Sequence, residues 1–282
     1  MQFLINWATE FIGKHRRWFI FNKIGLASYL VLRAYENRNF RMESNGEEWL
    51  LKTSSKLKNL GCVFDVGANV GEWLVLCRKY ISDAPIHAFE IAPQIFSELK
   101  GNTTTLKNVV LNATGLSDQN AEIEIFFSEN ANFLTTAYKA NLGKEFDLPG
   151  SSFSHSVTSQ RVPVICGDDY VSKNGINHID ILKIDVEGME GSVLRGFEKM
   201  FAQHRIRLVQ FEYNNTNIVS KFLLRDAYEF FGKYGYKVGK LYPNYVDFRD
   251  YHYRHEDFCG PNMVAIFKDD IELIELLNSR GK

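Results

Sequence analysis

The most informative segment of the chain is residues 63–73, which read Val63-Phe64-Asp65-Val66-Gly67-Ala68-Asn69-Val70-Gly71-Glu72-Trp73. Its apolar residues predict a buried strand that ends near Asp65, and two glycines then allow a tight turn before a helix that begins at Glu72. The first turn of such a helix points free backbone N–H groups at a bound ligand. Asn69 stands where the dinucleotide fingerprint has its middle glycine, so the turn favours a nucleoside ligand with a carboxylate over a dinucleotide.

Outward from this segment, short apolar runs alternate with helical patterns. Strands are predicted at 62–64, 86–89, 109–111, 179–184, 208–211 and 263–267, and helices at 72–80, 93–105, 189–200 and 221–233. Such alternation is typical of a mostly parallel sheet covered by helices on both faces. We therefore expect a doubly wound α/β domain over residues 59–282, with irregular insertions at about 128–160 and 242–262.

Polar side chains follow several of the predicted strands. Glu90 ends the second strand, 19 residues after Gly71, where an acidic residue accepts hydrogen bonds from both ribose hydroxyls. Ser117 and Asp118 follow the third strand, and they either contact the adenine side of a nucleoside or form an ordinary polar turn. Since ligands of open α/β sheets bind outside the carboxyl ends of the strands, these groups are expected at one site.

The fourth strand runs into an acidic segment around a glycine, Asp185-Val186-Glu187-Gly188-Met189-Glu190. Two carboxylates so close raise the pKa of one of them and help either to act as a base, so Asp185 and Glu187 are the predicted catalytic residues. Lys183 is interpreted as a salt-bridged structural lysine rather than a nucleophile. Asp185, Glu212 and Asn214 also offer oxygen ligands for Mg²⁺, but no further acid lies beside Glu212, so a resident metal is not expected.

The fifth strand and the two insertions supply candidate contacts to an acceptor. Glu212 and Asn214 end the fifth strand, His155 belongs to the first insertion, and Tyr245 and His252 belong to the second. The second insertion is rich in aromatic residues, which form either a stacking platform for a sugar ring or a loop packed by its own side chains. The histidines are reserve candidates for the base, although a lone histidine is more often an ordinary loop residue.

The amino-terminal segment differs in charge from the rest of the chain. Residues 1–42 contain seven Lys and Arg against two Glu. Basic amphipathic helices are predicted at about 2–16 and 21–36, and their apolar runs are too short to cross a membrane. We expect residues 1–58 to form a helical cap over the core. The alternative is an interfacial segment that touches anionic lipid at the inner face of a membrane.

Composition excludes several classes of protein. The chain has 282 residues and a formal net charge of −1, so no global field attracts nucleic acid. Its four cysteines form no C-x-x-C pair, which argues against a zinc cluster or a disulfide framework. This cysteine usage favours a reducing, cytoplasmic compartment. The oligomeric state stays open.

Taken together, the motifs resemble those of the FkbM family of S-adenosylmethionine-dependent methyltransferases. The matching segments are Asp65–Gly71, His87-Ala88-Phe89-Glu90, Leu116-Ser117-Asp118, Leu182-Lys183-Ile184-Asp185-Val186-Glu187-Gly188-Met189-Glu190 and Val193-Leu194-Arg195-Gly196. The resemblance implies a class I methyltransferase fold, which is Rossmann-like and has a seven-stranded sheet in the order 3-2-1-4-5-7-6. It also implies O-methylation of a hydroxyl on a sugar, a glycolipid or a polyketide-type secondary metabolite.

The resemblance further implies that S-adenosylmethionine is the cofactor. Its methionine part is assigned to Asp65, Gly67, Asn69 and Gly71, its ribose to Glu90, and its adenine side to Asp118. The full set of expected cofactor contacts is Asp65, Gly67, Ala68, Asn69, Gly71, Glu72, Trp73, Glu90, Ile91, Ser117 and Asp118. Ile91 departs from the family, where proline is common after the ribose-binding acid.

Two other functions compete with methyl transfer. An NAD-dependent oxidoreductase or epimerase of Rossmann type is disfavoured by Asn69, which replaces the glycine that lets a pyrophosphate approach. A membrane-associated binding module without catalysis is disfavoured by the acids that follow three of the strands, since a relic sheet has no use for them.

Overall fold

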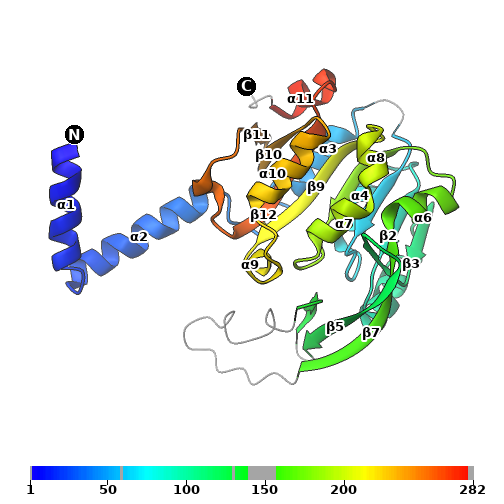
Figure 1. Ribbon diagram of the computed structural model, residues 1–282, viewed down its shortest axis with the longest axis horizontal. Helices are drawn as coiled ribbons and strands as arrows, with labels where there is room; N and C mark the ends of the chain where they lie inside the picture. The colour runs from blue at the N-terminus through cyan, green and yellow to red at the C-terminus, as the bar shows by residue number, and fades with distance from the viewer. Residues whose placement is uncertain (1, 58–59, 129–130, 139–156, 279–282) are drawn as a thin grey trace. The chain divides into compact units, whose positions relative to one another are not determined.

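The computed structural model describes residues 2–57, 60–128, 131–138 and 157–278 (Figure 1). The chain divides into two compact units, residues 1–39 and residues 40–282. The larger unit carries all the motifs quoted above from residue 63 onward, and it is built on two sheets.

The main sheet of the larger unit has eight strands in the order β11-β10-β12-β9-β8-β1-β2-β3. Their bounds are β1 (Val63–Val66), β2 (Ile86–Phe89), β3 (Val109–Asn112), β8 (Ile179–Ile184), β9 (Ile206–Asn214), β10 (Tyr236–Tyr242), β11 (Tyr245–Phe248) and β12 (Cys259–Phe267). From β3 to β9 every pairing is parallel, whereas β12 pairs antiparallel with β9 and β10, and β11 pairs antiparallel with β10. The α/β class is therefore confirmed.

The expectation of a seven-stranded sheet is wrong, because the sheet is mixed and has an eighth strand. Seven strands keep the expected order 3-2-1-4-5-7-6, which here is β3-β2-β1-β8-β9-β12-β10. The eighth, β11, comes from the segment expected to be an irregular insertion. Tyr242 pairs with Tyr245 across a two-residue turn, so residues 245–248 form a hairpin with β10 and extend the edge of the sheet.

Helices cover both faces of the main sheet (Figure 1). In the larger unit they are α3 (Glu47–Ser54), α4 (Glu72–Tyr80), α5 (Pro93–Asn102), α6 (Gly167–Lys173), α7 (Glu190–Gly196), α8 (Glu198–Ala202), α9 (Thr216–Ser220), α10 (Leu224–Lys233) and α11 (Ile271–Asn278), with a 3-10 turn η3 (Tyr253–His255). Adjacent strand residues point to opposite faces, so Phe64 packs with α6, α7, α8 and α10, and Val63 packs with α3, α4 and α11. The doubly wound arrangement follows from this two-layered core.

The smaller sheet accounts for part of the first expected insertion. Its strands are β4 (Gly115–Ser117), β5 (Ala121–Ser128), β6 (Ala131–Thr136) and β7 (Val157–Cys166), in the order β4-β7-β5-β6. Ile125 and Val162 pack against Ala92 and Ile95, which places this sheet beside the end of β2. Residues 139–156, with His155, lie outside the described residues.

The smaller unit consists of α1 (Gln2–Lys14) and α2 (Phe19–Tyr35). Both predicted helices are present: α1 ends two residues before its expected bound, and α2 begins two residues and ends one residue before its expected bounds. No residue from 2 to 35 is buried. Among the helices that the structure describes, none combines the length and the apolar character that crossing a membrane requires. The helical cap over residues 1–58 stays a prediction.

Candidate active site

The turn after β1 needs a backbone that most residues rarely adopt. Gly67, Asn69 and Gly71 have φ angles of +84°, +48° and +94°. A Cβ atom at Gly67 would collide with the carbonyl oxygen of Asp185, so a side chain there would push the turn away from the end of β8. The glycine therefore lets β1 and β8 present their carboxyl ends at one place.

Glu90 follows β2 and is fixed by backbone donors. Its Oε2 accepts a hydrogen bond from the Asn69 N–H at 3.0 Å, and its Oε1 accepts one from the Ala92 N–H at 2.8 Å. Burial raises the pKa of Glu90, and these backbone donors oppose the rise because they favour the charged form. The result is a rigid acidic side chain that reaches a cavity.

That first cavity has a volume of about 250 Å³ and lies between the two sheets' strand ends. Its apolar end is lined by residues of the β2–α5 segment and of the smaller sheet: Ile91, Ile95, Leu116, Ile123, Ile125 and Val164. Its polar end is lined by Asn69, Glu90, Asp185, Glu187 and Glu212. An apolar slot that leads into fixed polar groups suits a nucleoside, whose base is flat and whose ribose is polar.

A second cavity, of about 280 Å³, adjoins the first. The two share Gly67, Asn69, Asp185 and Glu212 in their linings. The rest of the second lining combines polar and apolar residues: Asn45, Glu47, Glu72, Lys183 and Asn262 are polar, and Phe40, Met42, Ala68, Val70, Trp73 and Pro261 are apolar. A ligand that fills the first cavity can therefore meet a second ligand beside Asp185 and Glu212.

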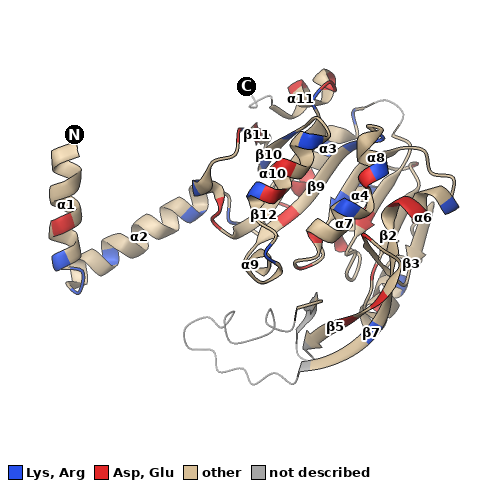
Figure 2. Ribbon diagram, viewed as in Figure 1, with Lys and Arg blue, Asp and Glu red and all other residues tan. Residues whose placement is uncertain are grey.

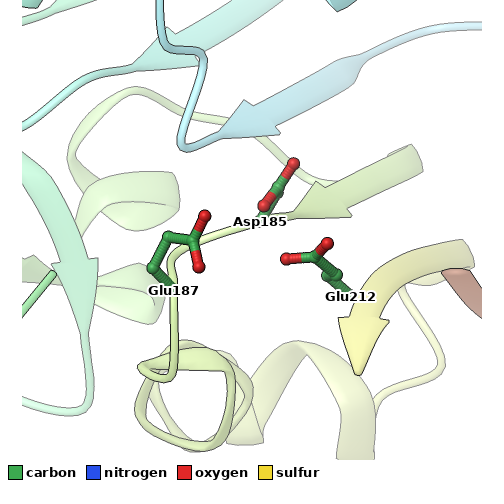
Figure 3. A group of neighbouring side chains, drawn as sticks. All are labelled: Asp185, Glu187 and Glu212. Carbon is green, nitrogen blue, oxygen red and sulfur yellow. The ribbon is translucent and has the colours of Figure 1, made fainter. Parts of the chain in front are cut away.

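Three carboxylates gather where the cavities meet. One oxygen each of Asp185, Glu187 and Glu212 lies within 4.8 Å of the others, and Figure 3 shows the three side chains facing a common space. Asp185 and Glu187 come from the segment after β8, and Glu212 comes from β9. Asp185 and Glu212 line both cavities, whereas Glu187 lines the first.

Two of these acids, Glu187 and Glu212, and the nearby Glu190 hold protons more strongly than ordinary carboxyl groups. Burial raises the pKa of Glu187 to about 8, and the charges of Asp185 and Glu190 add to the rise. Burial, followed by the charge of Asp185, raises the pKa of Glu212 well above its usual range. Burial also raises the pKa of Glu190 to about 7. The group can therefore share protons, and three oxygens at this spacing could also ligate a divalent cation.

Asn214 does not join the three carboxylates as an equal member. Its Nδ2 donates to Oε2 of Glu212 at 2.7 Å, and its Oδ1 accepts from the N–H and the hydroxyl of Thr216, both at 2.7 Å. Oδ1 of Asn214, which was expected as a possible magnesium ligand, is thus used to hold the chain after β9. Glu187 rather than Asn214 joins Asp185 and Glu212 in the group that could ligate a divalent cation.

Lys183 links two of the functional acids. Its Nζ lies 3.4 Å from Oδ1 of Asp65 and 3.2 Å from Oδ2 of Asp185, and it sits 5.7 Å from the centre of the Trp73 ring. Burial opposes the charge on Lys183, but the charges of Asp185 and Asp65 raise its pKa above the usual range. Both contacts agree with the interpretation of Lys183 as a salt-bridged lysine.

Asp65 itself is fully buried behind this lysine. Burial raises its pKa, and the Lys183 charge opposes that rise. Its second oxygen, Oδ2, has no hydrogen-bond partner within the described part of the chain. Asp65 lines neither cavity, so its direct effect is on Lys183 rather than on a ligand.

Several expected site residues lie away from the cavities. The Ser117 hydroxyl donates a hydrogen bond to Asp118 at 3.2 Å, and Asp118 forms an ion pair with Nε of Arg195 at 3.0 Å. Neither Ser117 nor Asp118 lines either of the two cavities. Tyr245 stacks on Tyr242 in the β10–β11 hairpin, with ring centres 4.9 Å apart. His252 accepts a hydrogen bond from the Arg254 N–H and does not line either cavity.

Three residues of the second cavity were not predicted from the sequence: Asn45, Glu47 and Asn262. Nδ2 of Asn45 donates to Glu47, and Nε2 of Gln210 donates to Glu47 at 2.8 Å and to Asn262 at 3.1 Å. The available signal was Gln210, a polar residue inside the apolar run of β9, since a buried amide needs polar neighbours.

Comparison with models of known protein families identifies one family. The Methyltransferase FkbM domain matches residues 65–238, which run from β1 into β10. The chain is 27% identical over 165 residues to the 31-O-demethyl-FK506 methyltransferase FkbM of Streptomyces tacrolimicus, covering 52% of this chain and 64% of that protein. It is 26% identical over 198 residues to the hexuronic acid methyltransferase AglP of Haloferax volcanii, covering 68% and 74%.

A further relative is Methyltransferase 1 of Beauveria bassiana, 27% identical over 144 residues and covering 48% of this chain and 58% of that protein. The chain thus spans less than two thirds of the length of the FkbM and Beauveria relatives. Among solved structures, the METTL16 methyltransferase domain superposes with a TM-score of 0.43 at 13% identity, over 80% of this chain and 67% of that one. Because the FkbM domain covers more than half of the sequence, the chain belongs to the FkbM methyltransferase family.

Proposed function

We propose that this chain transfers the methyl group of S-adenosylmethionine to a hydroxyl of a sugar, a glycolipid or a secondary metabolite. The observation that carries the proposal is the junction of the two cavities at Asp185 and Glu212. One cavity holds the apolar side chains and the fixed Glu90 that a nucleoside needs, and the other offers polar groups such as Asn45 and Asn262 to an acceptor. The shared wall is where an electrophile and a hydroxyl would meet.

The residues present fit the cofactor that the family uses. Without a Cβ at Gly67, the turn lies directly against the end of β8 beside the first cavity, and Glu90 is held for the ribose by two backbone donors. Ile91, Leu116 and Ile125 offer apolar contacts to the adenine. When bound, S-adenosylmethionine supplies a methyl group on a sulfonium sulfur, and the sulfur leaves as a neutral thioether.

The chain's own part in the reaction is to align the acceptor and to take up its proton. The acceptor oxygen forms a bond to the methyl carbon as the sulfur–carbon bond breaks, and the hydroxyl proton passes to a carboxylate. We assign that role to Asp185, because it lines both cavities and faces the Lys183 ammonium at 3.2 Å. Glu187, whose pKa is raised to about 8, holds a proton at neutral pH and can donate a hydrogen bond to the acceptor. Burial raises the pKa of Glu212 as well, which favours its protonated form.

Polar groups in the lining of the second cavity support this acceptor class. Amide and carboxylate groups of Asn45, Glu47 and Asn262 suit an acceptor with several hydroxyls. The names of two relatives point the same way, since one acts on a hexuronic acid and the other on 31-O-demethyl-FK506. Location is part of the proposal: we expect the enzyme in the cytoplasm, with contact to the inner face of a membrane.

The test is transfer of a labelled methyl group from S-adenosylmethionine to a panel of sugars, glycolipids and macrolides. Asp185→Asn is expected to lower kcat by roughly 10²–10⁴-fold, the usual contribution of a general base. Glu98→Gln, an exposed acid on α5, is the matched control and should leave kcat unchanged. Transfer by Asp185→Asn at the rate of the unmodified enzyme would remove Asp185 from the reaction. Absence of any transfer across the panel, with no binding of S-adenosylhomocysteine, would contradict the proposed function itself.

A further inference from the structure

The smaller unit exposes an unusual amount of apolar surface. Fifteen large apolar side chains between residues 3 and 35 are exposed, among them Phe3 at 80% and Phe19 at 75%. In α1 the polar residues Gln2, Asn6, Thr9 and Glu10 recur at helical spacing, so most of the remaining helix surface is apolar. Soluble surfaces seldom leave such a face in water, because burying it is strongly favourable.

The charge on the same unit is basic. Its exposed cations are Lys14, Arg16, Arg17, Lys23 and Arg33, and its only acids in the sequence are Glu10 and Glu36. Figure 2 shows α1 and α2 as largely uncharged helices with isolated basic positions. An apolar face bordered by cations is complementary to an anionic surface with an apolar interior.

The turn between the two helices is built from aromatic rings. The Phe11 ring stacks or meets edge-on with the rings of Trp7, Trp18 and Phe21, at 5.3, 6.2 and 6.0 Å. Arg16 and Arg17 lie in this turn and are exposed. Tryptophan rings and arginines are both enriched at the boundary between lipid headgroups and acyl chains.

From these observations we propose that residues 2–35 dock on an anionic lipid bilayer, with their apolar faces in the headgroup boundary and their cations on the lipid phosphates. An α-helix rises about 1.5 Å per residue, so the 17 residues of α2 extend roughly 25 Å, short of the roughly 30 Å of a bilayer's hydrocarbon. Helices that lie in the plane of the bilayer surface can bury their apolar faces and keep their cations at the lipid phosphates. The inference stands on these two helices and does not depend on methyl transfer.

The first experiment measures co-sedimentation of the full chain with vesicles of phosphatidylcholine, with and without about one third phosphatidylglycerol. Binding is expected only with the anionic lipid. Reversal of three cations, Arg16→Glu with Arg17→Glu and Lys23→Glu, should weaken partitioning at least about 100-fold, at roughly 1 kcal/mol for each cation lost and 1.4 kcal/mol for each factor of ten.

A matched control separates this effect from overall charge. Lys100→Glu with Lys107→Glu and Lys173→Glu makes the same change in net charge at exposed positions of the larger unit and should bind vesicles as the unmodified chain does. For the apolar face, Phe3→Ser with Phe19→Ser should weaken binding at least about tenfold. The control pair Tyr253→Ser with Ile271→Ser, 67% and 55% exposed, should not.

A fluorescence measurement keeps the test independent of any loss of folding in the variants. Trp7 and Trp18 lie in the proposed docking surface, whereas Trp73 is buried in the core of the larger unit. Brominated acyl chains should quench the unmodified chain, and Trp7→Phe with Trp18→Phe should remove that quenching while vesicle binding persists.

Three results would overturn the proposal. The first is equal binding to neutral and anionic vesicles. The second is equal loss of binding in the Lys100 control and in the charge-reversed variant. The third is concentration-dependent self-association that Phe3→Ser with Phe19→Ser abolishes while vesicle binding is unaffected, which would assign the apolar faces to a second copy of the chain.

Discussion

Replacing Lys183 by Met should destabilise the protein strongly. The ammonium group is buried and lies within 3.4 Å of two carboxylates, and Asp65 has no exposed surface at all. Removing one partner of a buried ion pair leaves an uncompensated charge and costs about 3–5 kcal/mol. We expect a loss of that size in the free energy of unfolding of Lys183→Met.

The loss should grow as the pH rises. Without the lysine, the folded-state pKa of Asp65 moves further above the value of roughly 3.9 that the unfolded chain has. The folded protein then binds a proton that the unfolded chain lacks, so its stability falls as pH rises from about 4 through the raised pKa. The destabilisation should therefore be larger at about pH 8 than at about pH 5.

Urea unfolding followed by circular dichroism measures both effects. Lys100→Met, an exposed lysine on α5, is the control and should change stability by less than about 0.5 kcal/mol. Lys183→Met with Asp65→Asn should recover a large part of the loss, because the buried carboxylate becomes neutral. A loss below about 1 kcal/mol in Lys183→Met, or no recovery in the double variant, would refute the ion-pair reasoning.

Two further predictions concern the turn and the acidic cluster. Gly67→Ala should lower the free energy of unfolding by at least about 1–3 kcal/mol in the same urea experiment, because φ is +84° and the new methyl group meets the Asp185 carbonyl oxygen. An unchanged urea midpoint of unfolding would show that the turn can move. Burial raises the pKa of Glu187 to about 8, so the folded chain holds a proton that the unfolded chain loses near pH 4.5, and stability should fall between about pH 5 and about pH 8. Glu187→Gln should flatten that fall, and an equally steep fall in the variant would assign the effect to other groups.

The sequence predicted the fold where strand and helix periods are clear. The runs around Phe64, Leu182 and Val209 are apolar on both sides, which identifies buried strands of an α/β sheet. An apolar run does not indicate the direction of its strand in the sheet. The residues of β12 therefore did not reveal that it runs antiparallel to β9. Residues 245–248 become a strand only because a two-residue turn pairs them with β10, and their irregular surroundings hid that pairing.

The site could be predicted where it depends on strand ends. Glu90 and Asp185 follow parallel strands, and Glu212 lies near the end of another; because parallel strands end at one edge, their meeting follows from topology. Asn45 and Asn262 line the second cavity but belong to segments far away in the sequence, and no local sequence pattern identifies them as site residues. Tyr245 was expected at the acceptor, but its ring stacks on Tyr242 in the hairpin, and a lone aromatic residue does not reveal which partner it takes.

The most direct test of the account is a calorimetric titration of the full chain with S-adenosylhomocysteine, with NAD as the comparator. Micromolar binding of S-adenosylhomocysteine and none of NAD is expected. Glu90→Gln should weaken it at least about tenfold, as for the loss of a charge-assisted hydrogen bond, and the control Glu98→Gln should not. Tight binding of NAD, or an affinity for S-adenosylhomocysteine that is the same in Glu90→Gln as in the unmodified chain, would contradict the claim that the first cavity is the methyl-donor site.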